Sequence, residues 1–104
     1  MKPVRVRPRV DRDVDLALAH VLEDAGPAAA AGLLRALREA FGRIAAHPRI
    51  GSPRHAHLLK GLRFWRVKRF PFLVFYLEQA KFVDVVRVLP MARDIPAALR
   101  HSFD

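Results

Sequence analysis

The amino-acid sequence predicts an α+β fold in which a two-helix hairpin packs on one face of an antiparallel sheet, with a short C-terminal helix at the sheet's far edge. Three runs dense in Val and aromatic residues follow one another between residues 61 and 89, which is typical of strands. Before them, two segments with helical apolar periodicity meet at Gly26 and Pro27. With 104 residues, 52% of them hydrophobic, residues 1–104 fit a single domain with a buried core.

The N-terminal segment combines a strand with the start of a helix. Residues 3–10 alternate Val with Arg, and Pro8 restricts this strand to the edge of a sheet. Asp11 or Asp13 can cap the first helix, and Gly26 supplies its end. We therefore expect an N-terminal edge strand followed closely by a helix.

The second helix begins at Pro27, which suits a first helical turn, and its apolar face runs from Ala30 to Ile44. Because the joint between the helices is tight, they should form an antiparallel hairpin. Leu16 falls outside the apolar face of the first helix. It is either an ordinary exposed leucine or part of a surface that meets a partner.

Three strands follow, and we expect them at Leu62–Arg69, Phe72–Leu77 and Phe82–Leu89. The linkers between them have hairpin length, and consecutive strands usually pair, so a three-stranded antiparallel meander should complete the sheet. The second strand is apolar on both faces. That pattern predicts a central strand that is covered on both sides or faces a partner.

The first of these strands has two different faces. Its two-residue period places Trp65 and Val67 on one face, suited to a core, and Phe64, Arg66 and Lys68 on the other. The second face presents an aromatic ring between cations. It is either a solvated sheet face or a surface for an anionic partner.

Arg87 lies inside a strongly apolar strand. One interpretation is structural: the guanidinium pairs with Asp84 or Glu78, or reaches solvent past its neighbours. The other is functional, and the sequence leaves both open.

The remaining segments carry little chemistry. Residues 47–54 read as a loop, and Asp94 can cap a short last helix through Leu99. His55 and His57 resemble a metal pair only by residue type, since no third ligand lies near them in the sequence. The sequence therefore predicts no metal site and no cofactor.

The net charge of +9 is large for this length and uneven. Residues 47–104 contain eleven Lys or Arg against four Asp or Glu, and no acid occurs between Arg49 and Leu77. Such a field predicts an anionic partner, which could be nucleic acid, an acidic protein or a membrane surface. Arginine outnumbers lysine fifteen to four, and arginine is the better group for forked contacts to phosphate or carboxylate.

The chain contains no cysteine, so a disulfide framework, a zinc–thiolate site and a cysteine nucleophile are excluded. A reducing compartment is the simplest interpretation. The N-terminus lacks the apolar run of a signal peptide, and the longest apolar stretch is too short to span a bilayer. We expect a cytosolic protein without a membrane partner.

The order of elements, together with several local motifs, resembles the ParE/RelE superfamily of toxins from type II toxin-antitoxin modules, and the motifs are closer to ParE. Those motifs are Pro48-x-x-Gly51, Gly61-Leu62-Arg63-x-Trp65-x-Val67, Phe70-Pro71-Phe72-Leu73-Val74-Phe75-Tyr76, Val86-Arg87-Val88-Leu89 and Ala92-Arg93-Asp94-Ile95. Many ParE-like sequences have a histidine where this one has Pro90. Any role of that histidine is absent here.

The resemblance implies two mechanisms. ParE-like members act on DNA gyrase, whereas RelE-like members cleave mRNA on the ribosome with a set of basic residues. Arg66 and Lys68 fall where RelE-like enzymes keep paired basic residues, and Arg93 lies near another such position, but Leu73 replaces an arginine and no tyrosine follows Tyr76. A nuclease site that lacks one preorganised cation loses about 3 kcal/mol of transition-state stabilisation. The resemblance therefore favours gyrase inhibition over endoribonuclease activity, with a non-toxic basic binding module as a third possibility.

The resemblance also implies partners, namely a cognate ParD-like antitoxin with an acidic segment and DNA gyrase as target, with the ribosome and mRNA as the alternative target. We expect the partner-binding residues to be basic or aromatic, with the nuclease alternative using only Arg66, Lys68 and Arg93. The full expected set is Arg63, Phe64, Arg66, Lys68, Arg69, Arg87 and Arg93.

Overall fold

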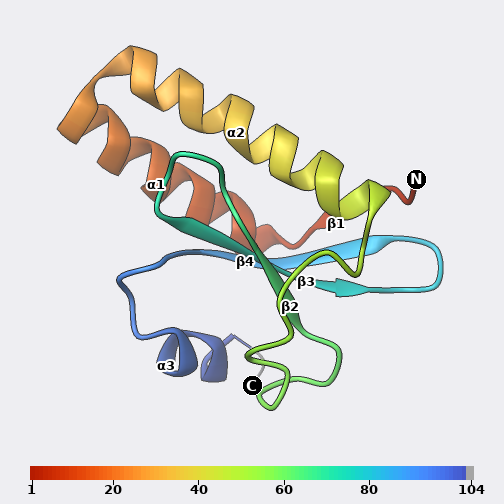
Figure 1. Ribbon diagram of the computed structural model, residues 1–104. Helices are drawn as coiled ribbons and strands as arrows, with labels where there is room; N and C mark the ends of the chain where they lie inside the picture. Colours follow the sequence, from red (N-terminus) through yellow and green to blue (C-terminus); the bar gives the residue numbers. More distant parts are fainter. Residues whose placement is uncertain (103–104) are drawn as a thin grey trace.

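The computed structural model, shown in Figure 1, describes residues 1–102. A two-helix hairpin lies over one face of a four-stranded sheet, and a short helix lies on the other side. This confirms the predicted α+β class and order of elements. The elements are β1 (Val4–Val6), α1 (Pro8–Ala25), α2 (Pro27–Ala46), β2 (Arg63–Arg66), β3 (Phe72–Glu78), β4 (Val83–Pro90) and α3 (Ile95–Arg100).

The strands are ordered β1-β4-β3-β2. β2 pairs antiparallel with β3, and β3 with β4, so the meander is confirmed. β1 pairs with β4 in parallel, with Val4 opposite Val83, and the sheet is therefore mixed rather than wholly antiparallel. The reason is that the chain crosses from β1 through the hairpin to the far edge, and its third meander strand then returns beside β1 in the same direction.

The hairpin covers one face of the sheet and forms the larger core with it. Phe72, Val74 and Tyr76 alternate along β3 toward the helices, where they meet buried residues such as Leu33 and Ile44. α1 lies over β4, and α2 contacts β2. Alternate positions of a strand face the same side of a sheet, so this face of β3 is fully used by the hairpin.

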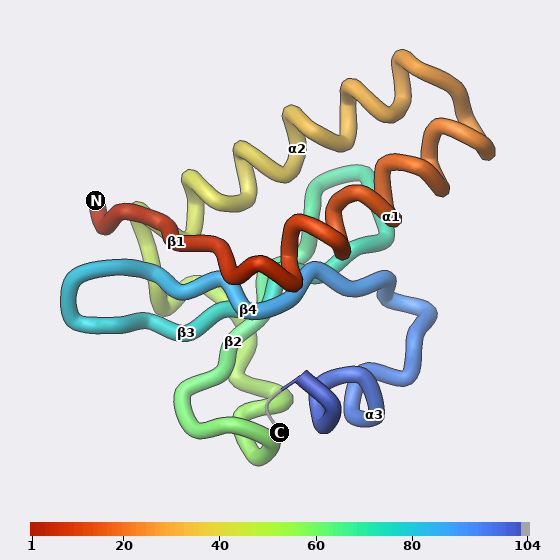
Figure 2. Tube along the Cα trace, turned by 180° about the vertical axis from the view of Figure 1, so that it is seen from behind, coloured from red at the N-terminus to blue at the C-terminus, as the bar shows by residue number. Residues whose placement is uncertain are grey.

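A second core lies on the opposite face. Leu73 and Phe75 point to that side and pack with Ile95 and Leu99 of α3, together with Leu62. Figure 2 shows α3 and the segment leading into β2 on the same side of the sheet, away from the hairpin. The expectation that α3 lies at the sheet's far edge is wrong, because its apolar residues cover the second apolar face of β3. That face is covered by the chain itself.

α1 begins earlier than expected. The predicted strand over residues 3–10 is reduced to Val4–Val6, and Pro8 opens the helix instead of interrupting a strand. Proline is favoured in a first helical turn, where its missing N–H has no helical partner to lose, and the early start buries Val10 completely. The predicted caps are therefore wrong, since Asp13 lies inside the helix and is itself buried.

β2 is shorter than the predicted Leu62–Arg69 strand. The Val67 amide donates to the Phe72 carbonyl at 3.0 Å and closes a turn, in which Arg69 has a φ of 71°. The strand ends at Arg66, and Arg69 adopts a left-handed conformation within the turn that follows. Among residues 1–102, no helix is both long and apolar enough to cross a membrane.

Candidate functional site

Arg66 and Lys68 meet in a hollow of about 450 Å³ between α2 and β2. Both side chains are exposed. Arg43 and Glu39 of α2 and the indole of Trp65 complete its charged and aromatic lining. The two predicted cations are thus brought together beside α2, and Lys68 lies in the turn after β2 and not on the strand. Trp65 lines the same hollow, so the predicted separation of Trp65 from these cations on opposite faces of the strand does not hold here.

The two faces predicted for the first strand of the meander are only partly as expected. Val67 is fully buried in the helix-side core and Trp65 packs against that core, which confirms the apolar face. Phe64 lies on the opposite side, with its ring centroid 5.6 Å from that of Phe75 and 5.7 Å from that of His55. It supports the second core and does not stand as a free ring between cations.

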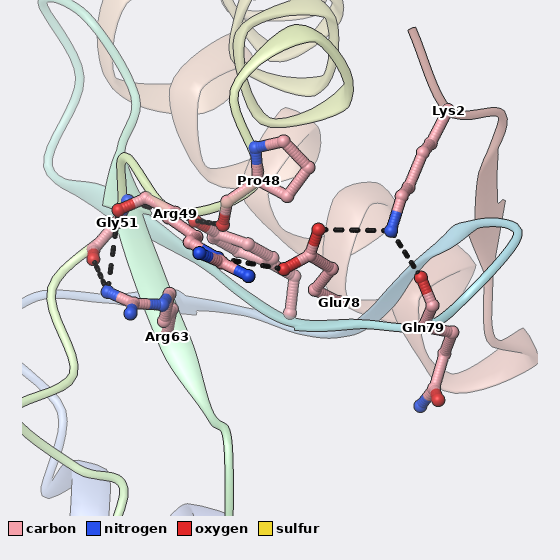
Figure 3. A network of polar contacts seen from close by, with 8 residues as sticks. Lys2, Pro48, Arg49, Gly51, Arg63, Glu78 and Gln79 are labelled. Carbon is pink, nitrogen blue, oxygen red and sulfur yellow. Dashed lines mark hydrogen bonds and ion pairs between the residues drawn. The ribbon is translucent and has the colours of Figure 1, made fainter.

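Arg63 is engaged with the loop after α2. Its Nη1 donates to the Gly51 carbonyl at 2.8 Å, as Figure 3 shows. The Tyr76 hydroxyl donates to the Pro48 carbonyl at 2.7 Å and accepts from the Gly51 amide at 2.9 Å. A Cβ at Gly51 would lie 2.5 Å from the Tyr76 hydroxyl and 2.7 Å from the Phe64 carbonyl oxygen. The Pro48-x-x-Gly51 motif therefore docks this loop on β3.

Glu78 holds the N-terminus to the β3–β4 turn. Its carboxylate accepts from Lys2 Nζ at 3.0 Å and lies 3.6 Å from Arg49 Nε, and Lys2 Nζ also donates to the Gln79 carbonyl (Figure 3). The hydrogen bond from Lys2, followed by the charges of Lys2 and Arg49, lowers the pKa of Glu78. Figure 3 thus shows a network of polar contacts that links the N-terminus, the loop after α2 and the sheet, and the predicted residue Arg63 belongs to it.

Arg87 is only 2% exposed and is fully paired. Its Nε and Nη2 each donate at 2.8 Å to the carboxylate of Asp13, and Nη1 donates to the Ser102 hydroxyl. The Asp13 carboxylate also accepts from the Val88 amide at 3.0 Å. A buried guanidinium needs such a partner, so Arg87 joins α1, β4 and the segment after α3.

The expected pairing of Arg87 with Asp84 or Glu78 is therefore wrong. Asp84 forms an ion pair with Arg7 at 2.9 Å, and Glu78 belongs to the network around Lys2. Because Arg87 lies in the interior, its guanidinium is not accessible to a partner, unlike the other predicted cations Arg66, Lys68, Arg69 and Arg93. Asp13 and Arg87 are separated by 74 residues in the sequence, and no local pattern indicated their contact.

Arg93 lies at a different hollow, of about 460 Å³, between α1 and the chain after β4. The Arg93 side chain is exposed. Leu16, which lies on α1 and also lines this hollow, is 64% exposed. Most of the lining is apolar and includes Ala17, Phe72 and Ala92. Arg66 and Lys68 line the hollow beside α2, whereas Arg93 lines the one beside α1.

His55 and His57 lie in the loop before β2, with ring centroids 6.2 Å apart. Burial, followed by the charges of His57 and Arg54, lowers the pKa of His55. Within the described part of the chain, its Nδ1 is buried without a hydrogen-bond partner. Residues 1–102 contain no group of three His, Cys, Asp or Glu side chains that could hold a metal ion.

The protein is a small basic α+β domain, in which a helical hairpin covers a mixed sheet. Hollows on its surface lie beside α1 and α2. Residues 4–95 match the family model described as the ParE toxin of the type II toxin-antitoxin system, parDE. The chain therefore belongs to the ParE toxin family.

A solved structure, the chromosomal ParDE TA system from P. aeruginosa, has a similar fold. The match has a TM-score of 0.74 at 20% sequence identity and covers 86% of this chain and 96% of that chain. At this identity the likeness concerns the fold. The comparison with curated proteins finds no matching sequence.

Proposed function

We propose that this ParE-type toxin blocks replication by inhibiting DNA gyrase and that a cognate antitoxin neutralises it. One observation favours DNA gyrase over ribosome-bound mRNA as the target. The cations that a RelE-like nuclease would use are dispersed, since Arg66 and Lys68 line the hollow beside α2 and Arg93 lines the hollow beside α1. Phosphoryl transfer needs preorganised charge aimed at one reacting group. Dispersed cations suit recognition of an extended anionic or acidic surface instead.

Two further positions support this choice. Leu73, which stands where the RelE pattern has an arginine, is 7% exposed and belongs to the second core. The hydroxyl of Tyr76 is used to hold the loop at Pro48 and Gly51. Neither side chain can serve a reacting phosphate without unfolding part of the molecule.

The antitoxin contact is supported by surface that folding leaves uncovered. The hollow beside α1 is mostly apolar and carries the exposed Leu16, and the hollow beside α2 carries Arg43, Arg66 and Lys68. Apolar hollows and concentrated charge are both features of protein-binding surfaces. The similar solved structure is described as a ParDE system. An antitoxin with an acidic segment would cover both kinds of surface.

The RelE-like alternative rests on the two cations that do converge, Arg66 and Lys68. Two assays on one purified preparation separate the functions: supercoiling by DNA gyrase and cell-free translation. Loss of supercoiling with intact translation is expected. Translation arrest with mRNA cleavage and normal supercoiling would reverse the order, and no effect in either assay would favour a non-toxic binding module.

A further inference from the structure

The hollow beside α2 continues into a third hollow of about 400 Å³. The two share Ala36, Glu39 and Lys68 in their linings. They therefore form one continuous depression between α2 and the chain from β2 to β3, which we call the α2 groove. Its lining residues are Gly32, Arg35, Ala36, Glu39, Ala40, Arg43, Trp65, Arg66, Lys68, Arg69 and Phe70.

Small residues form the helical side of the groove. Gly32, Ala36 and Ala40 are spaced four residues apart on one face of α2. A Cβ at Gly32 would contact the Phe70 ring at 3.6 Å, so the small side chain keeps this end open. At a rise of about 1.5 Å per helical residue, this stretch is about 12 Å long. That length matches about four residues of an extended peptide.

The groove is strongly cationic. Its positive residues come from both walls, and among the residues that the structure describes Glu39 is the one acidic residue in its lining. Within residues 1–102, none of these cations forms an ion pair with a carboxylate. Unpaired cations that converge on one depression favour an occupant with several carboxylates or phosphates. The cations are Arg35, Arg43, Arg66, Lys68 and Arg69.

Two features of the backbone beside the groove also bear on what kind of occupant it fits. Arg69 keeps a φ of 71°, a conformation that glycine adopts more easily, yet the position carries a cation that lines the groove. At the edge strand β2, the Phe64 N–H and C=O are bonded to Ser52 on the outer side. Because peptide groups alternate along an antiparallel ladder, those of Arg66 also face outward.

We propose that the α2 groove binds an extended, carboxylate-rich segment of a partner protein, about four residues long. Arginine forks pair with its carboxylates, and the outward peptide groups of Arg66 can pair with its backbone. A peptide fits these observations better than single-stranded nucleic acid, which has no amide edge to pair with β2. Trp65, the aromatic side chain on which a base could stack, is partly buried and packed against the core. The proposal rests on the antitoxin contact proposed above and specifies its chemistry at this groove, and it does not depend on gyrase as the target.

The test measures binding of a fluorescein-labelled hexaglutamate peptide to the purified protein by fluorescence anisotropy. The Arg43→Gln, Lys68→Gln double variant should weaken binding about tenfold or more, because it removes two charge-assisted contacts. The matched control is the Lys81→Gln, Arg100→Gln variant, which loses the same charge at exposed positions outside the groove. It should change the Kd less than about twofold. Raising the salt from about 0.1 M to about 1 M should weaken binding by the wild type.

A shape variant separates the groove from its charge. Ala36→Leu keeps every charge but fills the helical side of the groove, and it should also weaken hexaglutamate binding while its melting temperature stays near that of the wild type. Equal losses in the groove and control variants would overturn the proposal, as would absence of hexaglutamate binding by the wild type. Tighter, groove-dependent binding of hexathymidylate would assign the groove to nucleic acid instead. Any of these results leaves the gyrase assays unaffected.

Discussion

The side chain of Asp13 satisfies two buried groups at once. It accepts from the Arg87 guanidinium and from the Val88 amide. Asp13→Ala would leave a buried cation without its partner and an amide without an acceptor, so the free energy of unfolding should fall by about 3–5 kcal/mol. Urea unfolding followed by circular dichroism measures this. Asp15→Ala removes an exposed carboxylate from the same helix and should change stability by less than about 0.5 kcal/mol.

We expect His55 to make the stability of the protein depend on pH. Its pKa lies below the ordinary 6.5, first because of burial and then because of His57 and Arg54. As the pH falls through 6.5, the unfolded chain binds a proton there that the folded chain binds only at lower pH, so stability should decrease. The His55→Phe variant should lose this part of the pH dependence in unfolding experiments between about pH 7 and pH 5. An unchanged dependence would contradict the assignment.

The loop after α2 depends on a single hydroxyl. Tyr76→Phe removes both the donor to Pro48 and the acceptor for the buried Gly51 amide. The expected loss of stability is about 1–3 kcal/mol, because a buried polar group is left unpaired. Thermal unfolding measures the loss. A variant as stable as the wild type would show that water replaces the hydroxyl, and the docking of this loop would then not depend on Tyr76.

The β2–β3 turn contains the strained residue Arg69. Arg69→Gly should relieve about 1–2 kcal/mol of left-handed strain at a cost of about 0.5–1 kcal/mol in unfolded-state entropy. The net expectation is a protein that is more stable by up to about 1.5 kcal/mol in urea unfolding. Destabilisation would show that the arginine side chain holds the turn.

At the scale of elements, the sequence was sufficient where a local pattern dominates. The hairpin joint at Gly26 and Pro27 lies where breakers predict it, and β3 and β4 lie within one residue of their predicted bounds. β2 lies inside its predicted range but is shorter. The predicted strand over residues 3–10 is wrong in its second half, because Pro8 is compatible both with an edge strand and with a first helical turn. Burial of Val10 against the sheet decides between them, and that contact is tertiary.

The residues of the candidate surface were likewise predictable only where a local pattern determines them. Strand alternation predicts that Arg66 and Lys68 lie together, and both line one hollow. It could not show that Arg43 and Glu39 of α2 share that hollow, because their proximity depends on how α2 packs against β2. Nor could it show that Arg87 is buried, since its partner Asp13 lies 74 residues away.

The whole molecule is a sheet with two differently built faces. The hairpin and α3 cover the two sides of β3, so most charged side chains lie outside the two cores. The net charge of +9 favours fast, salt-sensitive association with acidic partners. The fold therefore separates the residues that hold it together, such as Arg63 and Arg87, from those that remain accessible, such as Arg66 and Lys68.

The most direct test of gyrase inhibition by this surface is the protein concentration that halves supercoiling by purified DNA gyrase. The wild type should inhibit, and the Arg66→Ala, Lys68→Ala variant should require about tenfold more protein if each cation contributes about 0.7 kcal/mol. Translation should remain intact in a parallel reaction. Undiminished inhibition by the folded double variant would show that these cations are not the site, and normal supercoiling at every concentration of the wild type would contradict gyrase as the target.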